Sequence, residues 1–184
     1  FYYYNSINLY GYKTATGEST KLLNWLSLGI DSNNMSGSNG MLIMPDGTVA
    51  TLMSEWDNST QSQSVELVKL KQVPASSVAQ RKTISLATMS LDWQSRSQII
   101  DFNKTNTEYV IDVRDYSEYN TEEDYSAGLT KLTTEILSGK MPDILDLNGM
   151  PVDQLAAKGL LEDLYPYLDN DSEISRDDIF PSVL

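Results

Sequence analysis

The stretch from residue 82 to residue 169 constrains the fold most, because strand-like and helix-like segments alternate along it. Residues 82–88, 109–113 and 141–147 are short apolar runs, and two segments with helical spacing separate them. Strands that alternate with helices of this length form βαβ units, in which a parallel sheet is joined by right-handed crossovers. We therefore predict an α/β fold of the order βαβαβα, with ligands bound beyond the carboxyl ends of the strands.

The predicted helices carry start and stop signals. Asp92 is a suitable N-cap for a helix over 93–104, residues 121–124 resemble a capping box for the next helix, and Pro151 fits the first turn of a third helix over 152–158. The second helix is expected to present one apolar stripe, which consists of Tyr125, Leu129, Leu132 and Ile136.

Residues 1–73 have a different composition, rich in Tyr, Ser, Asn, Thr and Gly, and show no helical period. Alternating runs and turn signals, among them Pro45, Asp46 and Gly47, predict an antiparallel β region. Roughly four short strands over about fifty residues match the size of one β-propeller blade, and a small independent sheet is the alternative. We expect the aromatic start, residues 1–4, to be a buried strand, and residues 74–81 to be a linker to the α/β domain of residues 82–184.

The composition excludes several classes of function. A formal net charge of −13 disfavours nucleic acid and anionic membrane surfaces as partners. The chain has no Cys and no His, which removes thiolate chemistry, the commonest general base and the commonest transition-metal ligand. The polar loop 31–40 and the acidic cluster 169–173 both fail the EF-hand pattern, so we expect no metal and no cofactor.

Neither a signal peptide nor an apolar run long enough to span a membrane is visible. The chain opens on Phe1 without an initiator Met and closes on Leu184 where a new element begins. We therefore expect it to be a fragment of a longer protein.

Four segments in order resemble extracellular solute-binding proteins of ABC transporters, of the carbohydrate-binding type found in Gram-positive bacteria. The segments are DFNK at 101–104, AGLTKL at 127–132, SGKMPDI at 138–144 and AKGLLEDLYPYLD at 157–169. The resemblance covers residues 82–184, which would be the incomplete N-terminal part of the first lobe of a periplasmic-binding-protein-like fold. Residues 1–73 fall outside it and look like the tail of a propeller-like sensor or binding region.

This resemblance implies a two-lobed protein that closes on a sugar or oligosaccharide, delivers it to an ABC permease and is held at the cell surface by a lipid anchor. Carboxylates and amides would bind the hydroxyls, and an aromatic ring would cover the C–H face of the sugar. The ligand-binding candidates carried over by position are Leu91, Asp92, Trp93, Asp146, Asn148 and Gly149, with Tyr116 and Tyr119 as weaker additions. Packing is the alternative role for Trp93.

Two other classes of function remain open. A glycan hydrolase needs a flanking pair of carboxylates, but Asp143 and Asp146 lie three residues apart in a predicted strand and point to opposite faces, so we predict no enzyme activity. A non-catalytic interaction or sensor module is the other alternative. Because the third strand lacks a partner at its far edge, we also expect the chain to self-associate.

Overall fold

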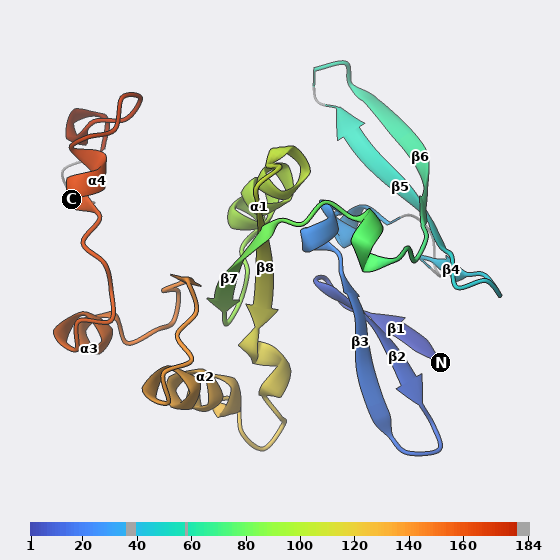
Figure 1. Ribbon diagram of the computed structural model, residues 1–184, viewed down its shortest axis with the longest axis horizontal. Coiled ribbons are helices and arrows are strands. Elements are labelled where there is room, and N and C mark those ends of the chain that lie inside the picture. Colours follow the sequence, from blue (N-terminus) through green and yellow to red (C-terminus); the bar gives the residue numbers. More distant parts are fainter. Residues whose placement is uncertain (36–39, 58, 180–184) are drawn as a thin grey trace. The chain divides into compact units, whose positions relative to one another are not determined.

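The computed structural model describes residues 1–35, 40–57 and 59–179. These residues contain two small antiparallel sheets and one parallel sheet, and their α-helices are confined to the second half of the chain (Figure 1). The fold is therefore mixed α/β, as the sequence predicts. Compactness divides the chain into two units, Phe1–Asn148 and Gly149–Leu184.

The elements follow the chain in three groups. The antiparallel strands are β1 (Tyr2–Tyr4), β2 (Asn8–Lys13), β3 (Glu18–Asn24), β4 (Leu42–Ile43), β5 (Val49–Asp57) and β6 (Ser62–Leu70). The parallel strands are β7 (Lys82–Thr88), β8 (Tyr109–Asp115) and β9 (Ile144–Leu145). The α-helices are α1 (Trp93–Thr105), α2 (Ala127–Leu137), α3 (Val152–Ala157) and α4 (Tyr165–Leu168). Short 3-10 helices are η1 (Leu26–Leu28), η2 (Ser32–Asn34), η3 (Ala75–Ser77), η4 (Tyr116–Tyr119) and η5 (Arg176–Asp178).

The parallel sheet has the strand order β8-β7-β9. The prediction is confirmed for β7 over its whole length and for β8, which extends two residues further. The third strand is much shorter than the predicted 141–147, because only Leu86 with Ile144 and Ala87 with Leu145 form parallel pairs. Pro142 has no N–H to donate, so pairing cannot extend evenly through the residues that precede β9.

Helix α1 covers one face of the parallel sheet. Asp92 caps it as predicted, because its carboxylate accepts hydrogen bonds from the backbone N–H groups of Gln94 and Ser95. Ile99 and Ile100 of α1 are buried in one hydrophobic cluster with β-strand residues and with two residues from the start of the chain. The other buried members of this cluster are Ile7, Leu26, Leu86, Ile111 and Val113.

Buried polar contacts bind the start of the chain to α1 and β8. The Asn103 side-chain amide donates to the carbonyl oxygens of Leu26 and Ile111, both at 2.9 Å, and its oxygen accepts from the N–H of Ile111 at 2.7 Å. The Arg96 guanidinium, also buried, forms an ion pair with Asp31 at 2.7 Å. Residues 1–34 and the parallel sheet therefore share one core. The boundary between the two compact units lies after residue 148, whereas the change in amino-acid composition predicts a domain boundary at 74–81. The domain boundary from composition therefore stays a prediction.

The six antiparallel strands are divided between two sheets, β1-β2-β3 and β4-β5-β6. Gly47 has a φ of 81°, which fits the predicted hairpin turn between β4 and β5. A propeller blade holds four strands in a single sheet, which differs from this division between two sheets. The likeness to a propeller blade therefore stays a prediction. The expectation that residues 1–4 are buried is wrong: β1 is an edge strand, and Phe1 and Tyr2 are 85% and 56% exposed.

Helix α2 begins at Ala127, five residues later than the capping box at 121–124 predicts. The Thr121 hydroxyl does accept from the Asp124 N–H, but this contact closes a turn before the helix. Tyr125 consequently lies outside the helix and is exposed, while Leu132 and Ile136 of the predicted stripe are buried. Gly128 permits close packing on η4, because a Cβ atom there would lie 2.0 Å from the Tyr116 carbonyl oxygen.

The second unit consists of short helices joined by turns. Helix α3 starts after Pro151 as predicted, and Gly159, with a φ of 66°, follows its end. The capping box that Ser175 and Asp178 form is present at η5. Arg176 binds the Asp169 carboxylate through both Nε and an Nη atom, at 2.5 and 2.6 Å. The acidic cluster at 169–173 is thus partly neutralised by an arginine.

We predict that Asn103→Ala lowers the free energy of unfolding by about 3 kcal/mol, because buried backbone groups of Leu26 and Ile111 lose their hydrogen-bond partner. Chemical denaturation followed by circular dichroism measures this change. Gln98→Ala on the exposed side of α1 is the matched control and should change stability by less than about 0.5 kcal/mol. Equal effects of the two substitutions would contradict the role assigned to Asn103.

Candidate functional site

The strand order β8-β7-β9 places a topological switch point between β7 and β9. The chain passes from β7 to β8 on one side and then crosses to β9 on the other, so the connections after β7 and after β9 diverge. In open α/β sheets, ligands bind at the carboxyl ends of the strands where this divergence occurs. The loop residues at this point are therefore the first place to look for a site.

Thr88, the last residue of β7, holds the two strand-end loops together. Its side-chain hydroxyl donates to Oδ2 of Asp146 at 2.7 Å and accepts from the N–H of Ser90 at 3.0 Å. Oδ1 of Asp146 in turn accepts from the N–H of Asn148 at 3.0 Å. Because Thr88 is fully buried and Asp146 is half-buried, this chain of contacts fixes the loops that follow β7 and β9 at their bases.

A second hydroxyl–carboxylate contact lies at the opposite end of β9. Oδ2 of Asp143 accepts from the N–H and the hydroxyl of Ser85, at 2.8 and 2.6 Å, while the Asp143 N–H donates to the same hydroxyl oxygen. These hydrogen bonds from Ser85 hold the pKa of Asp143 below its ordinary value. β9 has only two ladder residues, so the Ser85–Asp143 and Thr88–Asp146 contacts secure it at both ends.

The three candidates after β7 differ in their surroundings. Leu91 is half-buried and packs against the hydrophobic cluster beneath α1, so it contributes packing. Oδ1 of Asp92 caps α1 by accepting from the N–H groups of Gln94 and Ser95, and Oδ2 accepts from the Ser95 hydroxyl. These hydrogen bonds, first of all those from Ser95, lower the pKa of Asp92. Trp93 is 77% exposed, so most of its ring is accessible to a ligand.

The two tyrosine candidates lie in η4, after the other edge strand β8. Tyr116 is buried, and its hydroxyl donates to Glu135 at 2.6 Å. Burial and the neighbouring Glu135 carboxylate raise the Tyr116 pKa to about 12. Tyr119 is half exposed, and the Lys131 ammonium lies 4.6 Å from its ring centroid. Tyr116 is therefore a packing residue, and only Tyr119 offers surface to a ligand.

The candidates after β9 fall on the two sides of the division between the units. Asp146 and Asn148 belong to the first unit, and the Asn148 side chain is exposed. Gly149, with a φ of 72°, is the first residue of the second unit. The described contacts thus bring together Thr88, Asp146 and Asn148, while Asp92 and Trp93 follow a few residues later in the sequence, at the start of α1.

Sequence reasoning missed the roles of Ser85 and Thr88. Both hydroxyls belong to residues 82–88, where β propensity alone predicts a strand. The signal was the equal spacing of Ser85 and Thr88 on β7 and of Asp143 and Asp146 around β9, since both pairs lie three residues apart. This match becomes informative only when the two strands are known to be neighbours.

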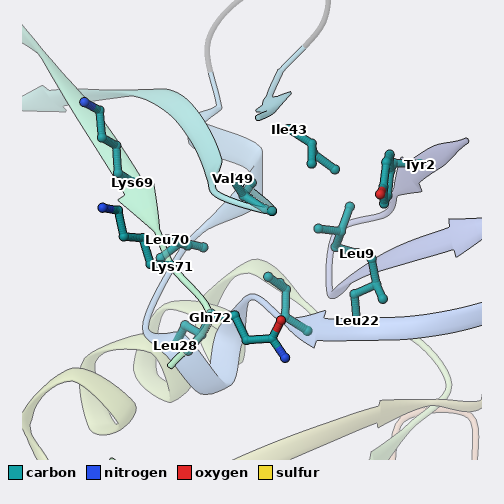
Figure 2. Close-up of a pocket in the computed structure, with 12 residues that line it drawn as sticks. Tyr2, Leu9, Leu22, Leu28, Ile43, Val49, Lys69, Leu70, Lys71 and Gln72 are labelled. Carbon is teal, nitrogen blue, oxygen red and sulfur yellow. The ribbon is translucent and has the colours of Figure 1, made fainter. Parts of the chain in front are cut away.

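A separate cavity of about 540 Å³ lies between the two antiparallel sheets. Figure 2 shows Leu9 and Leu22 of the first sheet on one side of it and Val49 and Leu70 of the second sheet on the other. Its volume and apolar lining are in the range of small-molecule pockets. The alternation of apolar residues in each strand does not reveal that these two faces oppose one another.

Within residues 1–35, 40–57 and 59–179, no group of three or more acidic side chains is placed to hold a metal ion. None of the helices among these residues is long and apolar enough to cross a membrane. The predicted loop at 31–40 lies partly outside the described residues, but Asp31 itself binds Arg96 and caps η2.

No protein-family model, curated protein or solved structure matches this chain.

We predict that Ser85→Ala destabilises the protein at neutral pH, and that the difference from the wild type shrinks in acid. Asp143 has a lowered pKa in the folded state, so its contribution to stability is present above the ordinary Asp pKa of about 3.9 and is lost as pH falls through the folded-state pKa. Thermal unfolding across a pH series measures this difference. Ser97→Ala, an exposed serine of α1, should give a difference that does not depend on pH.

Proposed function

We propose that this chain captures a carbohydrate as part of an extracellular substrate-binding protein of an ABC transporter. The observation that carries the proposal is the exposed ring of Trp93, the first residue of α1 after the loop that follows β7, near the switch point where Thr88 also fixes the Asp146 carboxylate. An accessible indole ring and a fixed carboxylate are complementary to the two chemical faces of a sugar.

Each group at the strand ends has a distinct task in this proposal. Trp93 stacks on the C–H face of a pyranose ring. Asp146 accepts hydrogen bonds from sugar hydroxyls with the lone pairs that Thr88 and the Asn148 N–H leave available. The exposed Asn148 amide both donates and accepts. Asp92 is less suited to ligand contact because Oδ1 caps α1 and Oδ2 accepts from the Ser95 hydroxyl.

The wider arrangement rests on the resemblance at 101–169. In this proposal residues 82–184 begin the first lobe of a periplasmic-binding-protein-like fold, a second lobe closes over the ligand, and an ABC permease receives it. Residues 1–73 form a propeller-like region upstream, and a lipid anchor attaches the protein to the outside of the cell.

The proposed function involves no catalysis. Asp143 and Asp146, the candidate pair for glycan hydrolysis, are each held by a β7 hydroxyl at opposite ends of β9. This supports structural and binding roles in place of a flanking acid–base pair. Turnover of any glycan by the pure protein that is abolished by Asp146→Ala would overturn this part of the proposal.

A non-catalytic interaction module is the second candidate function, and the cavity between the antiparallel sheets favours it (Figure 2). The exposed aromatic edge strand β1 also borders that region, since Tyr2 lines the cavity. In this alternative, the antiparallel region binds a partner and the parallel sheet acts as its scaffold.

We predict that Trp93→Ala weakens sugar binding roughly tenfold without changing the melting temperature of the free protein, because the exposed ring contributes to binding and not to packing. Isothermal titration with the sugar that stabilises the wild type most measures the affinity. Trp93→Phe should retain most of the binding, since it keeps an aromatic face.

The matched control is Trp56→Ala, which removes another exposed tryptophan from β5 in the antiparallel region. Its affinity for the sugar should equal that of the wild type. If Trp93→Ala also leaves the affinity unchanged, the strand-end loop is not the sugar site.

Thermal unfolding against a panel of mono- and oligosaccharides, with oligopeptides alongside, tests the substrate class. A ligand at one hundred times its dissociation constant stabilises the folded state by about 2.7 kcal/mol. A shift with one class of sugar would support the proposal, and shifts with peptides alone would replace the sugar by a peptide. The absence of any shift would favour the interaction module.

A further inference from the structure

Asn148 and Gly149 form an exposed Asn–Gly pair in the turn that follows β9. The N–H of Asn148 donates to Oδ1 of Asp146, whereas its side-chain amide has no hydrogen-bond partner among the described residues. The N–H of Gly149 likewise has no acceptor within that part of the chain. No described hydrogen bond therefore has to break before the Asn148 side chain and the Gly149 nitrogen meet.

Gly149 offers no steric barrier to a reaction at its backbone nitrogen. It has no side chain, its φ is 72°, and a Cβ atom built on it would meet no heavy atom within 4 Å beyond its chain neighbours. A residue with a side chain would partly cover the nitrogen and would be strained at this φ. Access from the Asn148 side chain to the Gly149 nitrogen is therefore open.

Other asparagines are held by contacts that this pair lacks. The side-chain oxygen of Asn103 accepts from the N–H of Ile111, that of Asn106 accepts from the N–H of Tyr109, and that of Asn120 accepts from the N–H of Gly128. These hydrogen bonds fix each side-chain amide away from the backbone nitrogen that follows it. None of the three is followed by a glycine.

The sequence contains one further Asn–Gly pair, at 39–40, whose glycine lies in a different environment. Asn39 lies outside the described residues, but Gly40 is buried and its carbonyl oxygen accepts from the Thr51 hydroxyl. A Cβ atom at Gly40 would lie 1.9 Å from the Tyr4 hydroxyl oxygen. A reaction at the Gly40 nitrogen therefore requires local opening, whereas a reaction at Gly149 does not.

We propose that Asn148 is a site of spontaneous deamidation. The Gly149 nitrogen gives its proton to hydroxide and attacks Cγ of Asn148, the Cγ–Nδ2 bond breaks, and ammonia leaves with a proton taken from water. The resulting cyclic imide then adds water and opens on either side, which yields aspartate or isoaspartate at position 148. The net reaction converts an amide and water into a carboxylic acid and ammonia, so nothing is oxidised or reduced.

The product differs from Asn148 in charge and in backbone length. A carboxylate replaces the amide close to Asp146, which adds a negative charge at neutral pH. In the isoaspartyl product the backbone runs through the former side chain, so an extra methylene joins the last residue of the first unit to Gly149, the first residue of the second. In the proposed sugar site, the change also removes the amide as a hydrogen-bond donor. Only this last consequence rests on the proposed function.

Incubation of the folded chain at neutral and at mildly alkaline pH, followed by peptide mapping with mass spectrometry, tests this inference. We expect aspartate and isoaspartate to accumulate at position 148 roughly tenfold faster for each unit of pH, because the deprotonated fraction of the Gly149 nitrogen rises by that factor. Conversion at position 39 should be roughly tenfold slower, the factor that a local opening costing about 1.4 kcal/mol imposes. In denaturant the two rates should become similar, because each pair then depends on its sequence alone.

Two matched variants assign the reaction to its residue. Asn148→Gln should remove most of the ammonia that the folded chain releases, because the longer side chain closes a ring far more slowly, and Asn39→Gln should leave the release nearly unchanged. The inference is overturned if position 148 does not convert, if positions 148 and 39 convert equally in the folded chain, or if the two variants release equal amounts of ammonia. Mass spectrometry detects the modification without any ligand, so this failure is distinguishable from a failure of sugar binding.

Discussion

The side-chain amide of Asn103 is the contact on which the first unit most depends. From α1 it binds the Leu26 carbonyl of η1 and both backbone groups of Ile111 in β8. A buried amide with three satisfied hydrogen bonds allows little displacement, because any shift leaves a polar group unpaired in the core. The start of the chain and the parallel sheet are thereby fixed in one arrangement, over which the apolar cluster around Leu26 can close.

Hydroxyl–carboxylate contacts extend this rigidity to the strand ends. β9 is too short for its two ladder pairs to define its position, and the contacts of Ser85 and Thr88 with Asp143 and Asp146 supply the rest. The Thr88 hydroxyl also binds the Ser90 N–H, so the loop that leads to Trp93 starts from a fixed point. A binding site at this position would therefore be largely formed before a ligand arrives, which reduces the entropic cost of binding.

The hairpin of β5 and β6 carries apolar side chains on both of its faces. Along β5 and β6, one face carries Val49 and Leu70 toward the cavity, and the other carries Leu52 and Leu67 into solvent. Strand alternation alone would assign one of these faces to a core. Both are apolar, so the sequence pattern does not identify which is covered, and only the approach of the first antiparallel sheet decides it.

The sequence by itself determined the strands β7 and β8, the Asp92 cap of α1 and the glycine turns, because each depends on a few neighbouring residues and their intrinsic preferences. Tertiary structure alone decided the length of β9, the burial of Tyr116 and the exposure of Trp93 and β1. Those outcomes depend on which distant segments come into contact, as when Asp143 binds Ser85, which lies fifty-eight residues away in the sequence. Local propensity does not predict these long-range contacts, because the free energy that stabilises them comes from packing and hydrogen bonds that form only in the folded chain.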